Sequence, residues 1–215
     1  AICGTVFFPT VGFTVCERCY ASLRQSAAVP IYVPVGDGEI TCVAAGEYGA
    51  EIAAVLYAFK FDCRRRVARD IVHALLGPTV TTVLNGIALG QNNTGASTVR
   101  TVPVPASAYG RFQRGFDQSF ELCRRLRFPV APLIQRGRGI QQKYLDKTDR
   151  SANAESAYRI RSASTVRRSL PPERNAAVIV IDDVVTTGAS IARCVTLLRE
   201  RGVDVRAAVV CAHKR

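Results

Sequence analysis

The sequence lacks the features that mark several classes of protein. Its 215 residues include no Met and no Trp, and they include two His, His73 and His213. So few imidazoles nearly exclude a His-based catalytic triad and a multi-His metal site. No apolar run approaches the roughly 20 residues that span a bilayer, and no basic region precedes the apolar N-terminus. We therefore expect no membrane insertion and no signal peptide.

The eight Cys lack the spacing of a secreted disulfide framework. Most lie singly in apolar or helical patterns, which favours reduced thiols and a cytoplasmic location. Cys16-Glu-Arg-Cys19 differs, because Cys-x-x-Cys lets two thiolates bind one metal ion from a tight turn. With Cys3, these residues are candidate zinc ligands in a small, degenerate zinc-ribbon-like module at residues 1–45. Cys42 is a substitute ligand, and buried thiols without metal are the alternative.

The positive charge is concentrated in one central segment. The formal net charge is +12, and residues 100–170 hold fifteen basic and five acidic side chains. Such a field attracts polyanions, namely nucleic acid, membrane headgroups or a polyphosphorylated small molecule. A solvated basic surface without a ligand is the alternative. Aromatic residues make up 7% of the chain and are not interleaved with the basic ones, which argues against a dedicated DNA-binding face.

Residues 46–215 have the pattern of an α/β domain. Val178–Ile181 is a β-branched apolar run, typical of a parallel strand buried on both faces. The expected helices are 52–59, 67–76, 116–126 and 189–201, and the expected strands are 101–105, 178–181 and 205–211. Gly77-Pro78 is expected to end the second helix, and residues 85–97 are expected to form a loop. The strand–helix–strand order near the C-terminus predicts a central, mainly parallel sheet flanked by helices.

The segment VIVIDDVVTTGASI, residues 178–191, carries the clearest chemical signal. In an open parallel sheet, ligands bind beyond the carboxyl ends of the strands, where Asp182 and Asp183 are expected. Their carboxylates match the hydroxyl donors of a ribose. The following turn opens a helix, and its hydroxyls, backbone N–H groups and helix dipole favour a phosphate. The predicted ribose 5-phosphate site comprises Asp182, Asp183, Thr186, Thr187, Gly188, Ala189 and Ser190. An acidic pair that caps a helix is the alternative.

Residues 178–191 resemble the PRPP-binding motif of type I phosphoribosyltransferases. Two other stretches narrow the resemblance to the ComF family of competence-associated phosphoribosyltransferase-like proteins. One is VPVPASAYGRFQRGFDQSFELCRRL, residues 102–126, and the other combines Gln142-x-x-Leu145, Arg150-x-x-Asn153 and Tyr158. Phe59-Lys60-Phe61 also resembles a segment of that family. The resemblance implies a type I phosphoribosyltransferase core over residues 46–215, which follows the N-terminal module.

The same resemblance implies further site residues. A pyrophosphate loop at Ala106–Gly110 and the stretch after it would contribute Ala106, Ser107, Arg111 and Arg114. A flexible loop at residues 136–158 would contribute Gln142 and Arg150, and Lys60 would approach the pyrophosphate. Mg²⁺ is expected with PRPP, and zinc in the N-terminal module.

Two functions follow from the resemblance. The first is transfer of a 5-phosphoribosyl group from PRPP to an unknown acceptor with release of pyrophosphate, with Asp182 and Asp183 as the catalytic pair. The alternative is a non-catalytic, competence-associated protein that handles single-stranded DNA or senses PRPP or nucleotides, with competence proteins as partners.

Overall fold

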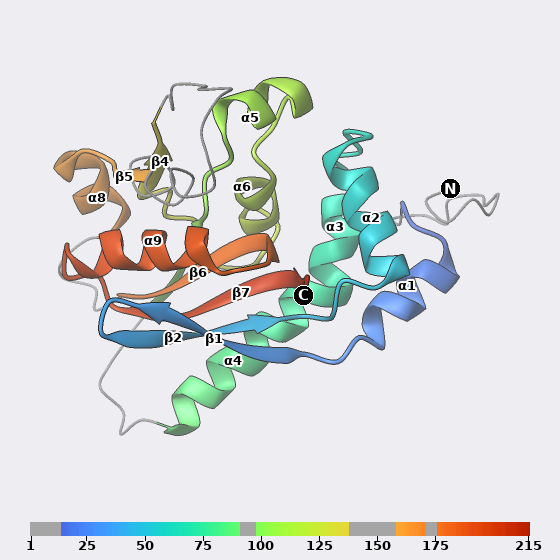
Figure 1. Ribbon diagram of the computed structural model, residues 1–215, viewed down its shortest axis with the longest axis horizontal. Helices are drawn as coiled ribbons and strands as arrows, with labels where there is room; N and C mark the ends of the chain where they lie inside the picture. Colours follow the sequence, from blue (N-terminus) through green and yellow to red (C-terminus); the bar gives the residue numbers. More distant parts are fainter. Residues whose placement is uncertain (1–13, 91–97, 138–157, 171–175) are drawn as a thin grey trace.

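A five-stranded sheet forms the centre of the computed structural model (Figure 1). The structure describes residues 14–90, 98–137, 158–170 and 176–215. The strand order is β1-β2-β7-β6-β3. These strands are β1 (Val29–Val35), β2 (Gly38–Ala44), β3 (Thr98–Pro103), β6 (Ala176–Val185) and β7 (Val205–His213). β2, β7, β6 and β3 are parallel, and β1 pairs antiparallel with β2. The predicted mainly parallel sheet is confirmed.

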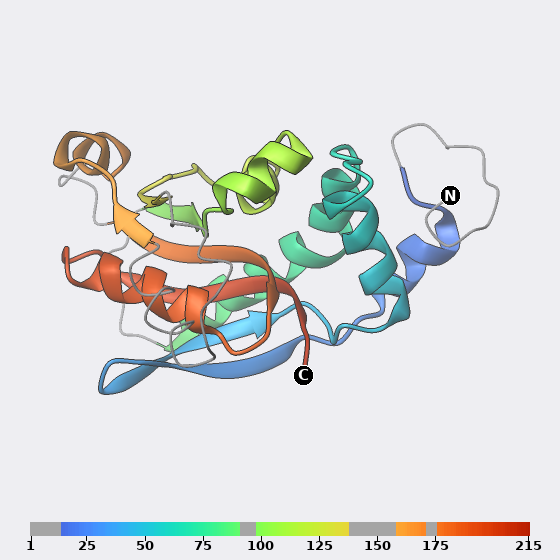
Figure 2. The same cartoon turned by 45° about the horizontal axis from the view of Figure 1, so that its top comes forward.

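Helices cover both faces of this sheet (Figure 2). On one face lie α1 (Glu17–Arg24), α2 (Ala50–Lys60), α3 (Val67–Ile71), η1 (Val72–Leu76), α4 (Gly77–Gly90) and α6 (Gln118–Cys123), and on the other lies α9 (Ala189–Arg199). The alternation of side chains along β6 divides the core: Ile179 and Ile181 join the first layer, and Val178 and Val180 join the second. This two-sided burial explains why the strand sequence is apolar without alternation.

Gly77-Pro78 does not end a helix, so that prediction is wrong. α3, η1 and α4 follow one another without a break from Val67 to Gly90, and helix therefore occupies residues 85–90, where a loop was expected. The turn before Gly77 is π-helical. A π-helical turn is wider than an α-helical one, and such turns occur where the i→i−4 hydrogen bonds of a helix are interrupted. A Cβ at position 77 would lie 2.7 Å from the carbonyl oxygen of Val72. Glycine is what lets the helix continue through this turn.

β1 and β2 form a hairpin that the sequence analysis did not predict. Its turn is Gly36-Asp37, with Gly36 at φ +59, a left-handed conformation that favours glycine. Pro30 and Pro34 lie on β1, where an edge strand tolerates residues without an N–H. Because β2 pairs with β7 in the central sheet, the predicted domain boundary at residue 45 falls between elements that share this sheet.

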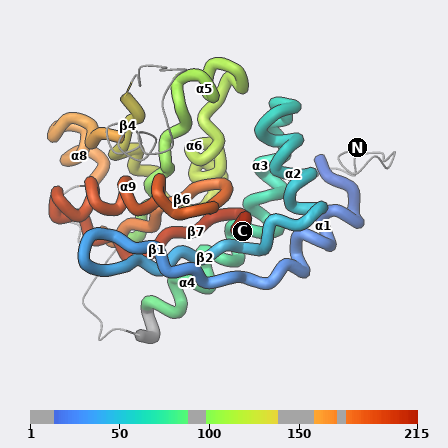
Figure 3. The backbone as a smooth tube through the Cα atoms, in the orientation of Figure 1, coloured from blue at the N-terminus to red at the C-terminus, as the bar shows by residue number. Residues whose placement is uncertain are grey.

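Four further elements complete the described part of the chain, and among them α8 lies on the side opposite to the arrowheads of β6 and β7 (Figure 1). They are α5 (Ala108–Arg114), β4 (Ile134–Arg136), β5 (Tyr158–Ile160) and α8 (Ala163–Ser169). The backbone tube in Figure 3 shows that β6 and β7 run toward the side of the molecule on which α2 and α3 stand. In the described part of the chain, no helix combines the length and the apolar character that crossing a bilayer requires.

Candidate active site

Three elements meet at the acidic pair on β6. Asp182 accepts a hydrogen bond from Ser119 Oγ of α6 at 2.8 Å and another from the backbone N–H of Asp183 at 2.9 Å. Asp183 Oδ2 lies 2.9 Å from Nζ of Lys60, the last residue of α2. Asp183 is buried, and Asp182 is partly exposed. The structure therefore brings together three of the predicted residues, Lys60, Asp182 and Asp183, and it adds Ser119.

The pair carries more negative charge than its surroundings neutralise. Burial raises the pKa of Asp182 to about 7, and the charge of Asp183 acts in the same direction. The hydrogen bonds from Ser119 and from the Asp183 N–H, together with the charge of Lys60, oppose that rise. A buried carboxylate whose pKa stays high still lacks donors or positive charge. This environment favours a ligand that supplies hydroxyl donors or a cation.

Buried thiols surround the pair and remain protonated. Burial raises the pKa of Cys42 to about 12, and the charge of Asp182 adds to the effect. The pKa values of Cys123, Cys194 and Cys211 are also raised, first by burial and then by nearby carboxylates. These are Asp117 and Asp182 for Cys123, Asp182 for Cys194, and Asp183 and Asp182 for Cys211. Cys194 and Cys211 are fully buried in the core. These thiols act as small apolar side chains rather than as nucleophiles.

The turn after β6 has the features expected of a phosphate site. Thr186 and Thr187 are exposed, and Gly188 has φ +78, which favours glycine. A Cβ on Gly188 would lie 2.9 Å from both methyl groups of Val33, so the turn packs directly against β1. α9 begins at Ala189, and its N-cap, Gly188, has no side chain, while the N–H of Ala189 donates a long hydrogen bond to Thr187 Oγ1 at 3.4 Å. The N-terminal N–H groups of an uncapped helix, with the positive end of its dipole, favour an anion.

The antiparallel pair of β4 and β5 contacts the start of α9, just after this turn, through Tyr158. The hydroxyl of Tyr158 donates a hydrogen bond to Ser190 Oγ at 3.2 Å. The guanidinium carbon of Arg136 lies 5.1 Å from the centre of the Tyr158 ring, a cation–π arrangement. Arg136 and Tyr158 are register partners at one end of the two-stranded ladder. The residues between them include Gln142 and Arg150, which lie outside the described residues.

The predicted pyrophosphate loop lies beside the acidic pair. The N–H of Val104 donates to the carbonyl oxygen of Ile181 at 2.9 Å, which extends the β3–β6 pairing to the residue before Asp182. The N–H of Ala106 donates to Asp117 Oδ2 at 2.9 Å, and Asp117 Oδ1 also accepts from the N–H of Phe120. Asp117 therefore caps α6 and holds the loop with one carboxylate.

The helix after this loop carries the predicted arginines. Ser107 is the N-cap of α5 and accepts a hydrogen bond from the N–H of Gly110 at 3.0 Å. Arg111 is exposed. Arg114 folds back along its own helix, and a Cβ on Gly110 would collide with the Arg114 guanidinium. Glycine at position 110 makes room for that conformation.

The predicted zinc ligands are described in part. Cys16 is the N-cap of α1, Cys19 lies in its first turn, and both are buried. Cys3 lies outside the described residues. Among the residues that the structure describes, no three His, Cys, Asp or Glu side chains are grouped so that they could hold a metal ion. The zinc site stays a prediction.

A second buried carboxylate was missed at the sequence level. The side chain of Glu121 on α6 is 2% exposed, with Arg65 at 2.7 Å and Arg124 at 3.5 Å, and it also pairs with Arg125. Through Arg65 this cluster ties the turn after α2 to α6, which are the two elements that supply Lys60 and Ser119. An acid three to four residues before two arginines is a signal for ion pairs within a helix. It does not reveal the partner at position 65.

The sequence of the chain is similar to those of known proteins. The phosphoribosyl transferase domain family matches residues 128–215, a stretch that includes β5, the acidic pair and the phosphate turn. The chain is 24% identical to the DNA utilization protein YhgH of Salmonella typhi, over 87% of this chain and 85% of that protein. The protein of the same name from Escherichia coli O6:H1 is 25% identical, over 74% of this chain and 66% of that protein. The predicted resemblance is confirmed: residues 128–215 match the phosphoribosyl transferase domain family, and most of the chain is similar to proteins named DNA utilization protein YhgH.

Proposed function

We propose that the protein binds PRPP at the carboxyl end of β6 and transfers its 5-phosphoribosyl group with release of pyrophosphate. One observation carries this proposal. The acidic pair, whose negative charge is only partly neutralised, is followed by a glycine turn and by a helix of eleven residues whose N-cap, Gly188, has no side chain. The carboxylates suit the ribose hydroxyls, and the turn suits the 5-phosphate. The exposed hydroxyls of Thr186 and Thr187 add donors on the phosphate side.

Each side chain around the pair has a role in the proposed reaction. As a nitrogen nucleophile bonds to C1 of the ribose, the bond from C1 to the pyrophosphate oxygen breaks, and positive charge develops on the sugar. Asp182 and Asp183 would stabilise that charge. The pKa of Asp182, raised to about 7, also suits it to accept the proton that the nucleophile loses. Lys60, which pairs with Asp183 in the structure, would turn to the departing pyrophosphate.

Mg²⁺ would enter with PRPP as part of the substrate and would neutralise pyrophosphate charge. The donors that the chain offers are the carboxylate oxygens of Asp182 and Asp183, which are hard ligands of the kind that Mg²⁺ prefers. The backbone N–H group of Ser107 and the guanidinium of Arg111 would hold pyrophosphate oxygens from the β3 side, whereas the N–H of Ala106 is already bound to Asp117.

Thermal unfolding in a titration with PRPP, with and without Mg²⁺, tests this function. A ligand that binds the folded state raises the Tm as its concentration exceeds its Kd. We expect stabilisation of the wild type and its loss in Asp182→Asn/Asp183→Asn. Asp37→Asn/Asp204→Asn, which changes two exposed carboxylates, is the matched control. A wild type that PRPP does not stabilise at saturating concentration would overturn the proposal.

Pyrophosphate release separates transfer from sensing. Release from PRPP in the presence of candidate nitrogen acceptors, lost in the double variant, supports the enzyme. Binding without release under every acceptor supports a PRPP sensor that uses the same pocket.

A second candidate function is nucleic-acid handling. The relatives are named DNA utilization proteins, and arginines cluster on the molecular surface outside the acidic pocket, at Arg64, Arg65, Arg66 and Arg124. Such a cluster attracts a phosphate backbone. DNA binding that falls steeply with salt and does not change in Asp182→Asn/Asp183→Asn would support this function, independently of PRPP.

A further inference from the structure

Ser119 places a fully buried hydroxyl against the acidic pair. The residue lies on α6 and is 0% exposed, and its Oγ donates a hydrogen bond to Asp182 Oδ1 at 2.8 Å. A buried hydroxyl costs free energy unless it is hydrogen-bonded, and alanine is the better helix former. The contact with Asp182 is therefore what a serine contributes at this position.

Asp182 is held through one of its two carboxylate oxygens. The N–H of Asp183 donates to the same atom as Ser119 does, Oδ1, at 2.9 Å. Among the residues that the structure describes, none forms a hydrogen bond with Asp182 Oδ2, and the side chain is partly exposed. Donors lie near the plane of the group that accepts them, so two donors fix the orientation of the carboxylate. Oδ2 is thus held in place and left to accept from a ligand.

The first turn of α6 also contacts the pyrophosphate loop. Asp117, the N-cap of α6, accepts from the N–H of Phe120 with Oδ1 and from the N–H of Ala106 with Oδ2. Ser119 lies within this turn. One helical turn therefore touches both the loop that is expected to hold pyrophosphate and the acid that is expected to hold the ribose.

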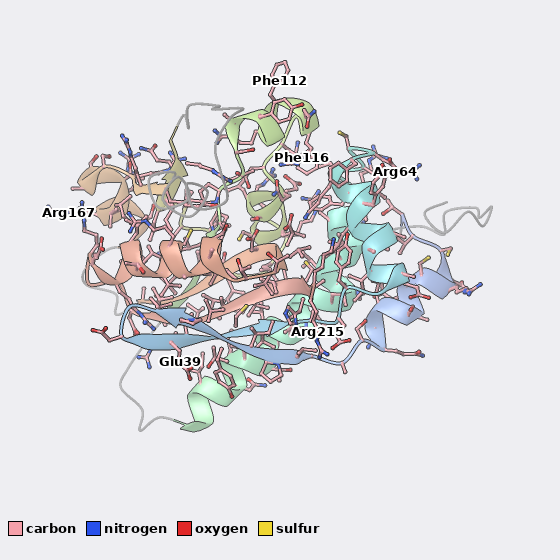
Figure 4. The ribbon with its side chains drawn as sticks, viewed as in Figure 1. Glu39, Arg64, Phe112, Phe116, Arg167 and Arg215 are labelled. Atoms are coloured by element: carbon pink, nitrogen blue, oxygen red, sulfur yellow. The ribbon has the colours of Figure 1, made fainter. Side chains whose placement is uncertain are left out.

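Neighbouring elements fix the position of this turn. The ring centre of Phe116 lies 5.2 Å from that of Phe59 on α2, and Figure 4 shows Phe116 between α5 and the turn that carries Arg64. Glu121, two residues after Ser119, is buried and pairs with Arg65 at 2.7 Å. Because α6 is anchored before and after Ser119, packing sets where the hydroxyl lies.

We propose that Ser119 is a positioning residue for the transfer reaction: its hydroxyl holds Asp182 so that Oδ2 accepts a hydrogen bond from a ribose hydroxyl of PRPP. The inference rests on the proposed function and extends it to a residue that acts through Asp182. Burial raises the pKa of Asp182, and the hydrogen bond from Ser119 opposes that rise because it favours the ionised carboxylate. Loss of the hydroxyl should therefore weaken PRPP binding and move the ionisation of Asp182 to higher pH.

Calorimetric titration with PRPP and Mg²⁺, on both sides of pH 7, tests this role. Ser119→Ala should bind PRPP more weakly at neutral pH by on the order of tenfold, the effect of one hydrogen bond to a charged group. The pH at which its affinity is half-maximal should lie above that of the wild type. Ser119→Thr keeps the hydroxyl and should restore both values, whereas Ser119→Cys, which offers a weaker donor, should also bind more weakly. Thr79→Val, which removes a buried hydroxyl bonded to the carbonyl oxygen of Leu75 at 2.8 Å, is the matched control.

The outcomes separate positioning from packing and from the proposed function. Weaker binding with a raised pH midpoint in Ser119→Ala, and wild-type behaviour in Ser119→Thr and Thr79→Val, support the proposal. Wild-type affinity in Ser119→Ala, a loss with no change in the pH midpoint, or an equal loss in Thr79→Val overturns it and leaves PRPP binding by the wild type standing. A wild type that does not bind PRPP overturns the proposed function itself, and with it the role of Ser119.

Discussion

The acidic pocket differs in burial and in charge from the exposed surface of the turn after α2 and of α5, which carries Arg64, Arg66, Arg111 and Phe112. In the pocket, Asp183 is buried and its partner Lys60 is 19% exposed, and the charge left over is negative. On the surface, Phe112 is 87% exposed, and the charge left over is positive. Loss of an interaction in the pocket is costly, because the charge that remains is buried and water cannot replace its partner. On the surface, water replaces what a substitution removes.

The largest effect on stability is expected at the buried ion pair. Lys60→Gln leaves Asp183 without its cation, and breaking a buried pair costs about 3 kcal/mol or somewhat more. Urea unfolding at neutral pH measures this loss. Arg64→Gln on the surface should change the free energy of unfolding by less than about 0.5 kcal/mol. Equal losses in the two variants would contradict the contrast between the two regions.

A smaller effect is expected in the phosphate turn. Gly188→Ala combines left-handed backbone strain of about 1 kcal/mol with crowding against Val33, for a total of about 2 to 3 kcal/mol. Gly36 has a similar φ, and a Cβ added there would meet nothing within 4 Å, so Gly36→Ala should cost the strain alone, about 1 kcal/mol. Chemical unfolding of both variants isolates the packing cost. If Gly188→Ala lowers the free energy of unfolding by no more than Gly36→Ala does, the side chain of Val33 must move to accommodate the added methyl group.

The stability of the pocket should depend on pH through Asp182. Its pKa is raised to about 7 in the folded protein, above its value of about 4 in the unfolded chain. The folded state therefore binds more protons between these values, and this group's contribution to stability falls as pH rises from about 4 through about 7. Asp182→Asn, which keeps an acceptor for Ser119, should be more stable than the wild type at pH 8. That gain should shrink toward pH 5.

Thermal unfolding of wild type and Asp182→Asn across this pH range measures the difference. Asp204→Asn, at an exposed ion pair, is the control and should shift the free energy of unfolding by a pH-independent amount. If the stability of the wild type relative to Asp182→Asn rose between pH 5 and 8, the pKa of Asp182 would not be raised in the folded protein, and the prediction would be wrong.

The smallest effect on stability is expected on the surface itself. Phe112→Ala removes an exposed ring, so the free energy of unfolding should change by less than about 0.5 kcal/mol. Phe59→Ala, on a ring buried in the core against Phe116, should cost about 3 to 5 kcal/mol. Denaturant unfolding of both variants compares the loss of an exposed ring with the loss of a buried ring. A large loss in Phe112→Ala would mean that the ring supports the fold.

Local patterns were enough to predict most of the parallel core. The apolar run at Val178–Ile181, the helical spacing after Ala189 and the helical pattern within 116–126 all describe interactions within a few residues, and the structure contains a strand or a helix in each place. The helix through Gly77-Pro78 could not be predicted in this way. A wide turn and packing by neighbouring elements decide whether a helix passes such a pair, and neither is a local property of the residues.

By itself, the sequence determined the order of strand, acidic pair, glycine turn and helix, because β-branched runs, paired acids and a left-handed glycine act through neighbouring residues. The tertiary structure alone decided which side chains meet. Lys60 is more than a hundred residues from Asp183 in the chain, and Ser119 lies far from Asp182, yet both contact the pair. Contacts of this range depend on how layers pack, and packing is a property of the whole chain rather than of any segment.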